Sequence, residues 1–291
     1  MPLDHVKHIV VVLSGKGGVG KSTVACQLAL TLAHSMNLRV GILDVDICGP
    51  SVPKICGVEN GSVLQGADGT WTPVEVHKGK AAHGNGKEEA GCEGKLFVMS
   101  IAYLLPSPTD AVVWRGPRKD AMIKQFIQDV RWGELDYLIV DTPPGTSDEH
   151  MTLCEAIARH NPTGAVIVTT PQEVSTDDVK KELSFCHKLK LRCLGIVENM
   201  SGFICPHCSE CTDIFSKGGG KKLADLYDVQ FLGEIPLDAQ ISVTEDAGVS
   251  VDDGAGTFLR HRWQSVVQNI LAQVARVDAL VVGGEKSHPV E

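Results

Sequence analysis

The sequence has no excess of basic residues and no long apolar run. Its 291 residues include 27 lysines and arginines against 36 aspartates and glutamates, which gives a formal net charge of −9. Nucleic-acid-binding proteins carry a basic face, so this balance argues against a nucleic-acid partner. No run of about 20 apolar residues is present to span a bilayer, and the apolar run at residues 9–13 is too short for the core of a signal peptide. We therefore expect a cytosolic or nuclear protein with no membrane partner.

What the chain does contain is an alternation of short apolar runs and segments with helical spacing. Hydrophobic residues make up 43% of the sequence, which is too many for a disordered chain. Short apolar strands that alternate with helices predict an α/β fold, a mostly parallel sheet with helices on both faces. Strands are predicted at residues 8–13, 39–44, 96–101, 137–141, 165–170, 193–197 and 231–235. Helices are predicted at residues 21–35, 118–130, 149–159, 174–189, 221–227 and 257–277.

Two segments depart from this alternation. Residues 77–95 are dense in Gly, Lys, Glu and Ala and have almost no apolar content, which predicts a mobile surface insertion. Residues 278–291 carry two glycines and a proline and predict a frayed tail. We therefore expect one domain over residues 1–277, which includes the insertion and an irregular loop at residues 200–219.

A glycine-rich loop separates the first predicted strand from the first predicted helix. It matches the phosphate-binding P-loop pattern at every fixed position, through the run Gly15, Lys16, Gly17, Gly18, Val19, Gly20, Lys21 and Ser22. Glycines let backbone N–H groups close around phosphate oxygens, and the helix that follows adds its positive dipole end. Lys21 then supplies a cation to the β and γ phosphates, the Ser22 hydroxyl ligates Mg²⁺, and Thr23 reaches the α phosphate. The loop therefore predicts a site for ATP and Mg²⁺; the alternative is an ordinary glycine-rich turn.

The loop carries a second lysine, Lys16, directly after its first glycine. In this position it resembles the signature lysine of the deviant Walker A ATPases. The resemblance implies a dimer in which Lys16 reaches the partner's nucleotide and neutralises charge on the γ phosphate, as an arginine finger does elsewhere. The alternative is a solvated lysine without a catalytic role.

Acidic residues follow two of the predicted strands, at the sheet edge where such folds bind ligands. Asp141 comes directly after an apolar run, the Walker B arrangement, and is expected to hold Mg²⁺ through water. The Gly145 N–H can sense the γ phosphate, which would make residues 142–148 a switch segment. Asp46 is placed to orient or activate the attacking water, or else to cap the next turn, and Asp44 is expected to support the site.

Asn199 follows the predicted strand at residues 193–197. Its side-chain amide can pair with the donor and acceptor edge of a purine, so we assign it to the nucleotide site. The alternative is a loop asparagine that forms an Asx turn.

The second chemical signal is a pair of thiols. Cys205 and Cys208 have the C-x₂-C spacing that lets two thiolates converge on one soft metal. A closed site for Zn²⁺ or an iron–sulfur cluster needs four ligands, and the chain has no second, separate pair. Two-fold symmetry can supply it, with both thiols of each subunit meeting across the interface. The spacing therefore predicts a dimer that holds the metal between its subunits.

Three other interpretations of this stretch stay open. A thioredoxin-like pair would carry redox chemistry alone, but it would lie between a strand and a helix. Cys205, Cys208 and Cys211 together with His207 can hold one zinc ion. The thiols can also be buried without a metal, as is expected of the cysteines that occur singly in apolar stretches, namely Cys26, Cys48, Cys56, Cys154, Cys186 and Cys193.

A family resemblance rests on five motifs that occur in order along the chain. They are the P-loop at residues 16–22, DVDICGPS at 44–51, WRGP at 114–117, DTPPGT at 141–146 and the cysteine pair at 205–208. Together they resemble the Mrp/ApbC group of SIMIBI-class P-loop ATPases, over residues 5–276, and within it the cytosolic iron–sulfur assembly scaffolds of eukaryotes. The resemblance implies a slow ATPase that assembles a labile 4Fe–4S cluster between two subunits and transfers it to apo-proteins.

The resemblance also implies partners. The eukaryotic system uses two related subunits, of which the longer has an N-terminal extension with four cysteines. Here no cysteine precedes Cys26, so the chain resembles the shorter subunit. This implies a homodimer, or a heterodimer or heterotetramer with the longer scaffold ATPase, and contacts with apo iron–sulfur proteins and targeting factors.

Two other functions stay open at this point. The chain can be a nucleotide-switched interaction protein whose cysteines hold a structural zinc at the dimer interface. It can also be a small-molecule kinase, although no sequence feature marks a pocket for a phosphate acceptor. A MinD-like membrane ATPase is disfavoured, because the end of this chain is polar and short instead of a basic amphipathic helix.

Overall fold

The computed structural model describes residues 3–47, 49–76, 94–105, 114, 116–204, 211–212, 217–238, 241 and 256–282. Within them lies a nine-stranded sheet with the spatial order β10-β9-β8-β1-β7-β2-β6-β5, and β11 also pairs with β9. Its strands are β1 (Val6–Leu13), β2 (Arg39–Asp44), β5 (Val74–Val76), β6 (Lys95–Ser100), β7 (Leu135–Asp141), β8 (Gly164–Thr169), β9 (Cys193–Ile204), β10 (Cys211–Thr212) and β11 (Phe231–Leu237). All the pairs are parallel except β5 with β6 and β10 with β9. A separate hairpin pairs β3 (Leu64–Gln65) with β4 (Trp71–Thr72).

The central strands form where aliphatic residues follow one another without a polar break. In β1 the residues from Ile9 to Leu13 are all at most 2% exposed. Such a strand is buried on both faces, so its sequence shows no alternation, as is typical of parallel sheets between two helical layers.

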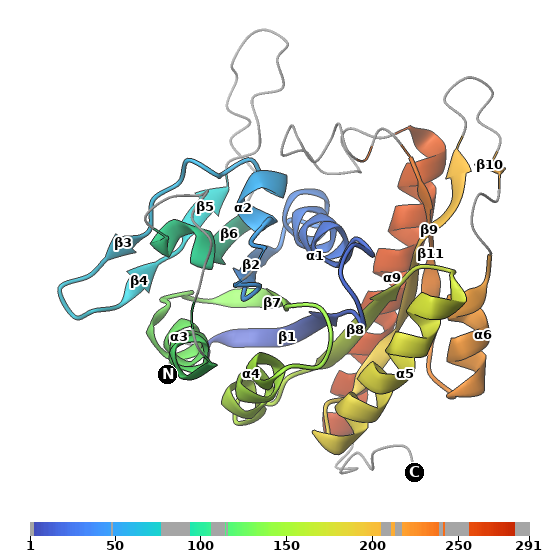
Figure 1. The fold of residues 1–291 in the computed structure, drawn as a ribbon. Coiled ribbons are helices and arrows are strands. Elements are labelled where there is room, and N and C mark those ends of the chain that lie inside the picture. The colour runs from blue at the N-terminus through green and yellow to red at the C-terminus, as the bar shows by residue number, and fades with distance from the viewer. Residues whose placement is uncertain are drawn as a thin grey trace, which may run out of the picture.

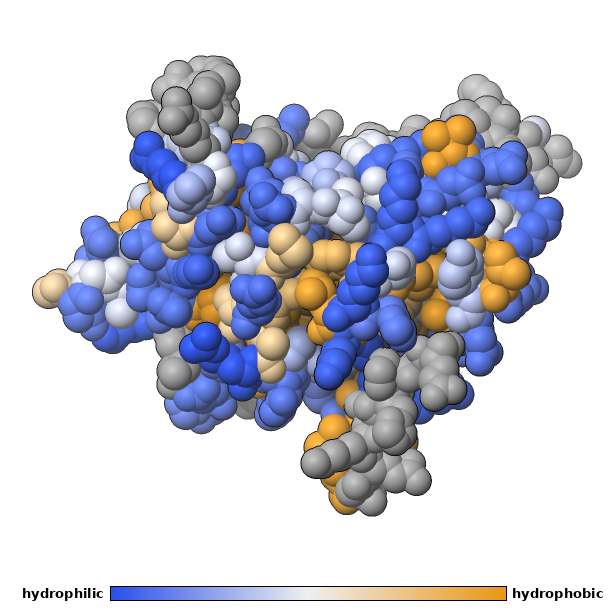
Figure 2. Space-filling view, turned by 60° about the horizontal axis from the view of Figure 1, so that its bottom comes forward, coloured by the Kyte–Doolittle hydropathy of each residue, from blue (hydrophilic) through white to orange (hydrophobic). Residues whose placement is uncertain are grey.

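Helices cover both faces of the sheet (Figure 1). One layer contains α1 (Lys21–Leu30), the short α2 (Val52–Ile55) and α9 (Thr257–Val282). The other contains α3 (Gly116–Asp129), α4 (Asp148–Ala158), α5 (Glu173–Lys188) and α6 (Gly219–Leu226). Each layer buries its own apolar core against the sheet, and the face shown in Figure 2 is largely hydrophilic with smaller apolar patches. The predicted α/β fold is confirmed.

The parallel register brings the carboxyl ends of several strands together. Asp44 at the end of β2 is paired in register with Asp141 at the end of β7, and with Ser100 at the end of β6. Asp141 is also in register with Val12 of β1, which leads into the glycine-rich loop. The acids predicted to form the site therefore meet at one edge of the sheet.

The structure corrects the prediction at the edges of the sheet. β9 runs on to Ile204, and Ile204 pairs with Cys211 of the antiparallel strand β10, so residues 200–204 do not belong to an irregular loop. Lys95 begins β6 and is not part of an insertion, and β5 adds an antiparallel strand beside it. These edges depend on pairing between strands, which a local pattern of apolar residues does not record.

Two helices also differ from their predicted bounds. α9 continues to Val282, so residues 278–282 are helical and not frayed. The first helix is α-helical only to Leu30 and continues as a π-helical turn over Thr31–Ser35. Residues 77–93 and 283–291, which hold most of the predicted insertion and tail, lie outside the described residues.

α9 is the one described helix that is long and apolar enough to cross a membrane by length and composition, with a mean hydropathy of 1.3 over an 18-residue window within Phe258–Val282. Its residues Leu259, Trp263, Val266, Val267, Ile270 and Val274 are nevertheless buried against the sheet. The Trp263 Nε1–H donates to Thr31 Oγ1 across 2.7 Å. The part of α9 from Leu259 to Val274 therefore packs as a core helix.

A buried carboxyl group in α5 has no polar partner. Glu182 is 1% exposed, and neither of its carboxylate oxygens has a hydrogen-bond partner among the described residues. Burial, together with the negative charge of Asp178, raises the pKa of Glu182 to about 7. The folded chain therefore keeps this proton at a pH where the unfolded chain has lost it. The free energy of unfolding should fall as the pH rises from about 4.5 to about 7.

We expect Glu182→Gln to remove this pH dependence, because the amide is neutral at every pH. Relative to the wild type, the variant should gain up to about 3 kcal/mol of unfolding free energy between pH 5 and pH 8. Urea unfolding at several pH values measures this change, and a constant packing cost of the amide cancels in the comparison. Stability curves that run parallel for the two proteins would contradict the assignment.

Candidate functional site

The glycine-rich loop lies between β1 and α1 at the carboxyl edge of the sheet. Gly18 and Gly20 have φ angles of 78° and 81°, a conformation that glycine adopts without steric cost. A Cβ at Gly20 would lie 2.1 Å from Nδ2 of Asn199, and a Cβ at Gly15 would lie 2.6 Å from Cβ of Asp178 on α5. The loop is therefore packed between β9 and α5, and a side chain at Gly15 or Gly20 would force these neighbours to move.

A buried polar cluster joins this loop to the end of β7. Lys21 Nζ lies 2.6 Å from Asp141 Oδ1, and the Ser22 hydroxyl donates to Asp141 Oδ2 across 2.6 Å. Asp141 is fully buried and Lys21 is 6% exposed. Burial raises the pKa of Asp141, and the charge of Lys21 and the two hydrogen bonds oppose this shift. The structure thus brings together the predicted phosphate-binding cation and the two oxygen donors that suit Mg²⁺.

The two acids after β2 have different environments. Asp44 is fully buried and accepts hydrogen bonds from Ser100 Oγ at 2.8 Å and from the Asp46 N–H at 3.0 Å. Burial, and next the charge of Asp141, raise the pKa of Asp44 to about 8. Asp46 is half-buried and accepts from the Gly49 N–H at 3.2 Å, which is the turn-capping contact. Asp44 therefore holds the turn directly after β2 in place, while its support of the site and a role of Asp46 toward water stay predictions.

The segment after Asp141 is held against the P-loop strand. The Thr142 hydroxyl donates to the Val12 carbonyl at 2.8 Å, and the Gly145 N–H donates to the Ser14 carbonyl at 2.7 Å. Gly145 has a φ of 79°, which only glycine adopts readily. In this conformation the Gly145 N–H is engaged, so sensing a phosphate would require this hydrogen bond to be exchanged.

Asn199 contacts the loop instead of standing free beside it. Its Nδ2 donates to the Val19 carbonyl across 2.9 Å, and the residue is 5% exposed. It lies within β9, so it does not form the Asx turn of the alternative interpretation. The amide braces the P-loop, which the sequence did not predict, and its contact with a purine stays a prediction.

One buried carboxylate that sequence reasoning missed lies next to Asn199. Glu198 is fully buried and accepts from Ser201 Oγ at 2.6 Å, from the Gly218 N–H at 3.0 Å and from the Gly220 N–H at 2.6 Å. It therefore ties β9 to the N-terminus of α6, where the helix dipole favours a negative charge. These contacts hold the two chain ends from which the cysteine-containing stretch emerges.

The predicted metal ligands Cys205 and Cys208 lie outside the described residues, in the link between β9 and β10. In the part of the chain that the structure describes, no group of three or more His, Cys, Asp or Glu can hold a metal ion. Of the single cysteines predicted to be buried, Cys193 is half-buried and Cys48 lies outside the described residues. The other four are buried, as predicted, namely Cys26, Cys56, Cys154 and Cys186. Lys16 is half-buried, and its contact across a dimer stays a prediction.

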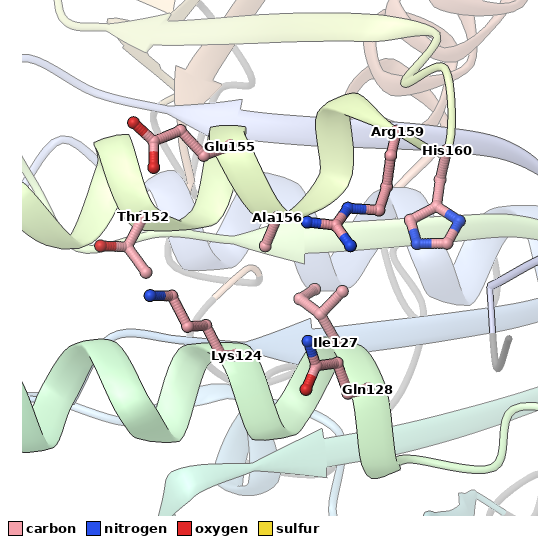
Figure 3. A pocket seen from close by; sticks show the side chains of 8 residues that line it. All are labelled: Lys124, Ile127, Gln128, Thr152, Glu155, Ala156, Arg159 and His160. Atoms are coloured by element: carbon pink, nitrogen blue, oxygen red, sulfur yellow. The ribbon is translucent and has the colours of Figure 1, made fainter.

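A cavity lined by described residues lies elsewhere, between α3 and α4. It has a volume of about 410 Å³. Figure 3 shows the Lys124 ammonium and the Arg159 guanidinium pointing into the space between the two helices, with Ile127 beside them. Nothing in its lining resembles the backbone cradle of a phosphate site, so we place the nucleotide chemistry at the loop and not here.

The parallel sheet, the glycine-rich loop at its carboxyl edge and the buried Lys21–Ser22–Asp141 cluster define a P-loop NTPase. A family model described as the NUBPL iron-transfer P-loop NTPases, of the ParA group, matches residues 5–275, and the chain belongs to this family. This confirms the resemblance inferred from the motifs.

Relatives of high similarity carry informative names. The cytosolic Fe-S cluster assembly factor NUBP2 of Gallus gallus is 57% identical over 246 residues, covering 84% of this chain and 85% of that protein. The cytosolic Fe-S cluster assembly factor CFD1 of Saccharomyces cerevisiae is 54% identical over 236 residues, covering 81% of this chain and 76% of that protein. These names confirm the predicted cytosolic location.

Solved structures agree with this placement. A nucleotide-binding protein from Archaeoglobus fulgidus, in complex with ADP and with cobalt, has a TM-score of 0.71 and 37% identity, covering 90% of this chain and 93% of that one. MinD of Aquifex aeolicus has a TM-score of 0.59 at 17% identity, covering 91% of this chain and 97% of that one. The second likeness shows the fold alone.

Two roles of Asn199, bracing the P-loop and contacting a purine base, can be distinguished by experiment. If the amide acts by bracing the P-loop, Asn199→Ala should weaken ATP and GTP binding alike, by about two- to tenfold, the value of one hydrogen bond. Competition binding with both nucleotides measures this. Asn269→Ala, which removes an amide that donates to the Leu232 carbonyl at 2.9 Å, is the matched control and should bind as the wild type does. A change confined to one purine would instead support base reading.

Proposed function

We propose that the protein is an ATP-dependent scaffold that assembles a labile 4Fe–4S cluster at a dimer interface and transfers it to apo-proteins in the cytosol. The observation that carries this proposal is the path of β9. Its residue Asn199 contacts the P-loop, and the same strand ends at Ile204, directly before Cys205. A change at the nucleotide therefore has a short, rigid route to the predicted cluster ligands.

The nucleotide half of the function rests on the buried cluster. Lys21, which pairs with Asp141 in this structure, binds the β and γ phosphates in this proposal, and Thr23 reaches the α phosphate. Ser22 and Asp141 are the residues to hold Mg²⁺, which neutralises phosphate charge in such sites. Asp46 then orients the attacking water, and Lys16 of each subunit reaches the nucleotide of the other. These roles make the protein a slow ATPase.

The cluster is the cargo of this scaffold. Each chain offers Cys205 and Cys208, and a 4Fe–4S cluster needs four thiolates, so two chains are required. A two-fold axis supplies the second pair. The second chain is another copy or the longer related ATPase. The names of the relatives, which describe Fe-S cluster assembly factors, support this proposal.

A double substitution tests the ligand assignment. Cys205→Ala with Cys208→Ala should abolish cluster binding after anaerobic reconstitution, measured as iron and sulfide per dimer and by the brown absorbance. Cys154→Ala is the matched control, because this thiol is 7% exposed within α4 and should be dispensable. A double variant that keeps its iron would contradict the proposal, and a colourless wild type with stoichiometric zinc would favour the structural-zinc alternative.

Lys16 gives a separate prediction. Lys16→Ala should lower ATP turnover by at least about tenfold, because it removes the positive charge that neutralises the transferring phosphate in the partner subunit. Nucleotide affinity should stay within about twofold of the wild type, since Lys21 supplies the cation within the same subunit. Steady-state hydrolysis and equilibrium binding separate the two effects. Unchanged turnover would refute the role in trans.

A further inference from the structure

His150 is a fully buried histidine that neither the predicted nor the observed nucleotide site accounts for. It lies in the first turn of α4, directly after the segment that runs from Asp141 to the Ser147 N-cap. Its ring meets Phe185 of α5 edge-on, with the centroids 5.9 Å apart and the rings at 84°. This contact limits the rotation of the ring, so its two nitrogens face defined neighbours.

One ring nitrogen already has a partner. The Ser147 N–H donates to His150 Nδ1 across 3.3 Å, and the Ser147 hydroxyl lies 3.1 Å from the same atom. Ser147 and His150 thereby form a capping box at the start of α4, in which histidine replaces the usual glutamate. Because Nδ1 accepts a backbone N–H, the hydrogen-bond network assigns the proton of the neutral ring to Nε2. Burial lowers the pKa of His150 to about 4, so the ring is neutral at physiological pH.

The other ring nitrogen, Nε2, has no hydrogen-bond partner in the described part of the chain. Nε2 is buried and makes no hydrogen bond with any described group. The backbone carbonyl of Pro143 lies close enough to raise the pKa of the ring against the effect of burial, but it does not meet the geometry of a hydrogen bond with Nε2. An unpaired buried donor is costly, so a conformation that pairs it gains stability.

Pro143 and Ser147 are the two ends of the stretch that carries Gly145. The Gly145 N–H is held by the Ser14 carbonyl at 2.7 Å in this conformation. A shift of Pro143 toward the imidazole would move the backbone between the two prolines and Ser147, and with it the Gly145 N–H. The imidazole of His150 therefore lies close to both ends of this segment.

We propose that His150 is a positioning residue of the nucleotide switch: it anchors Ser147 through Nδ1 and, when a nucleoside triphosphate is bound, donates Nε2–H to the Pro143 carbonyl. This hydrogen bond stabilises the conformation that residues 142–147 adopt with the triphosphate bound. Without the triphosphate the Nε2–H is unpaired, so the conformation of the same segment is less stable. His150 touches no substrate and acts through the backbone that carries Gly145. This inference rests on the proposed ATP switch and names the group that biases it.

Two substitutions separate the two ring nitrogens. His150→Asn keeps an acceptor near Nδ1 and removes the Nε2 donor. It should leave MgADP affinity within about twofold, and it should lower both turnover and the preference for a non-hydrolysable ATP analogue over ADP by about tenfold, the effect of one buried donor. His150→Gln offers an amide donor near Nε2, and its side-chain carbonyl can accept the Ser147 N–H, as glutamine does at this position of a capping box. It should retain more of the preference than the Asn variant does.

A measurement on the unaltered protein keeps the test independent of folding defects. The ¹⁵N shift and solvent exchange of the His150 Nε2–H, followed by NMR, should change on addition of the ATP analogue and stay unchanged on addition of ADP. Hydrogen exchange of the peptide that covers residues 142–147 should slow with the analogue in the wild type and not in His150→Asn. The inference would be overturned by an Nε2–H signal that does not change when the analogue is added. It would also be overturned if His150→Asn kept the wild-type preference for the analogue over ADP.

Failure of this inference and failure of the proposed function give different results. A wild type that binds no cluster, yet shows the His150-dependent preference for the triphosphate, rejects the scaffold and keeps the switch residue. A wild type that binds a cluster and hydrolyses ATP, with both variants changed only in melting temperature, keeps the scaffold and assigns His150 a structural role alone.

Discussion

The carboxylate of Asp141 organises the site. It lies in the interior of the protein, where an unpaired charge is costly, and it is compensated by the Lys21 ammonium and the Ser22 hydroxyl at 2.6 Å each. Removing one partner of such a buried pair costs about 3–5 kcal/mol, because the other charge is left alone. The glycine-rich loop, the start of α1 and the end of β7 are thus held together by the same groups that the proposed chemistry uses. A phosphate ligand would take over Lys21, and this exchange would free the carboxylate for a metal-bound water.

β9 connects the P-loop to the predicted cluster ligands along the chain. Asn199 contacts the Val19 carbonyl, and the neighbouring Glu198 accepts from the Gly218 and Gly220 N–H groups at the N-terminus of α6. The chain leaves this framework at Ile204 and is held again where Cys211 pairs with it. Both ends of the cysteine-containing link are therefore fixed to elements that also touch the P-loop. Coupling between the proposed nucleotide and cluster sites would need no long pathway, because β9 runs from one to the other.

A second connection runs from Asp141 in the other direction. The segment after it is held to β1 by Thr142 and Gly145 and ends in the Ser147–His150 capping box. α4 is in turn joined to α3 through the ion pair of Lys119 with Glu149 at 2.9 Å and the hydrogen bond from Thr152 to Asp120 at 3.0 Å. A movement of the segment would therefore reach α3, which begins at Gly116 within the WRGP motif.

The sequence by itself determined the elements whose signals are local. The P-loop needs glycines at fixed spacing before a helix, and the central strands are short apolar runs, so the loop, the Walker B acid and the order of strands and helices were predictable. Only the tertiary structure decided the contacts between distant residues. It placed Asn199 on the Val19 carbonyl, brought Asp178 against Gly15, gave Glu198 its three donors and added β5 and β10 to the sheet edges. The physical reason is that hydrogen-bond partners and strand pairing depend on which side chains folding brings together, whereas propensity and apolar spacing depend on neighbours along the chain.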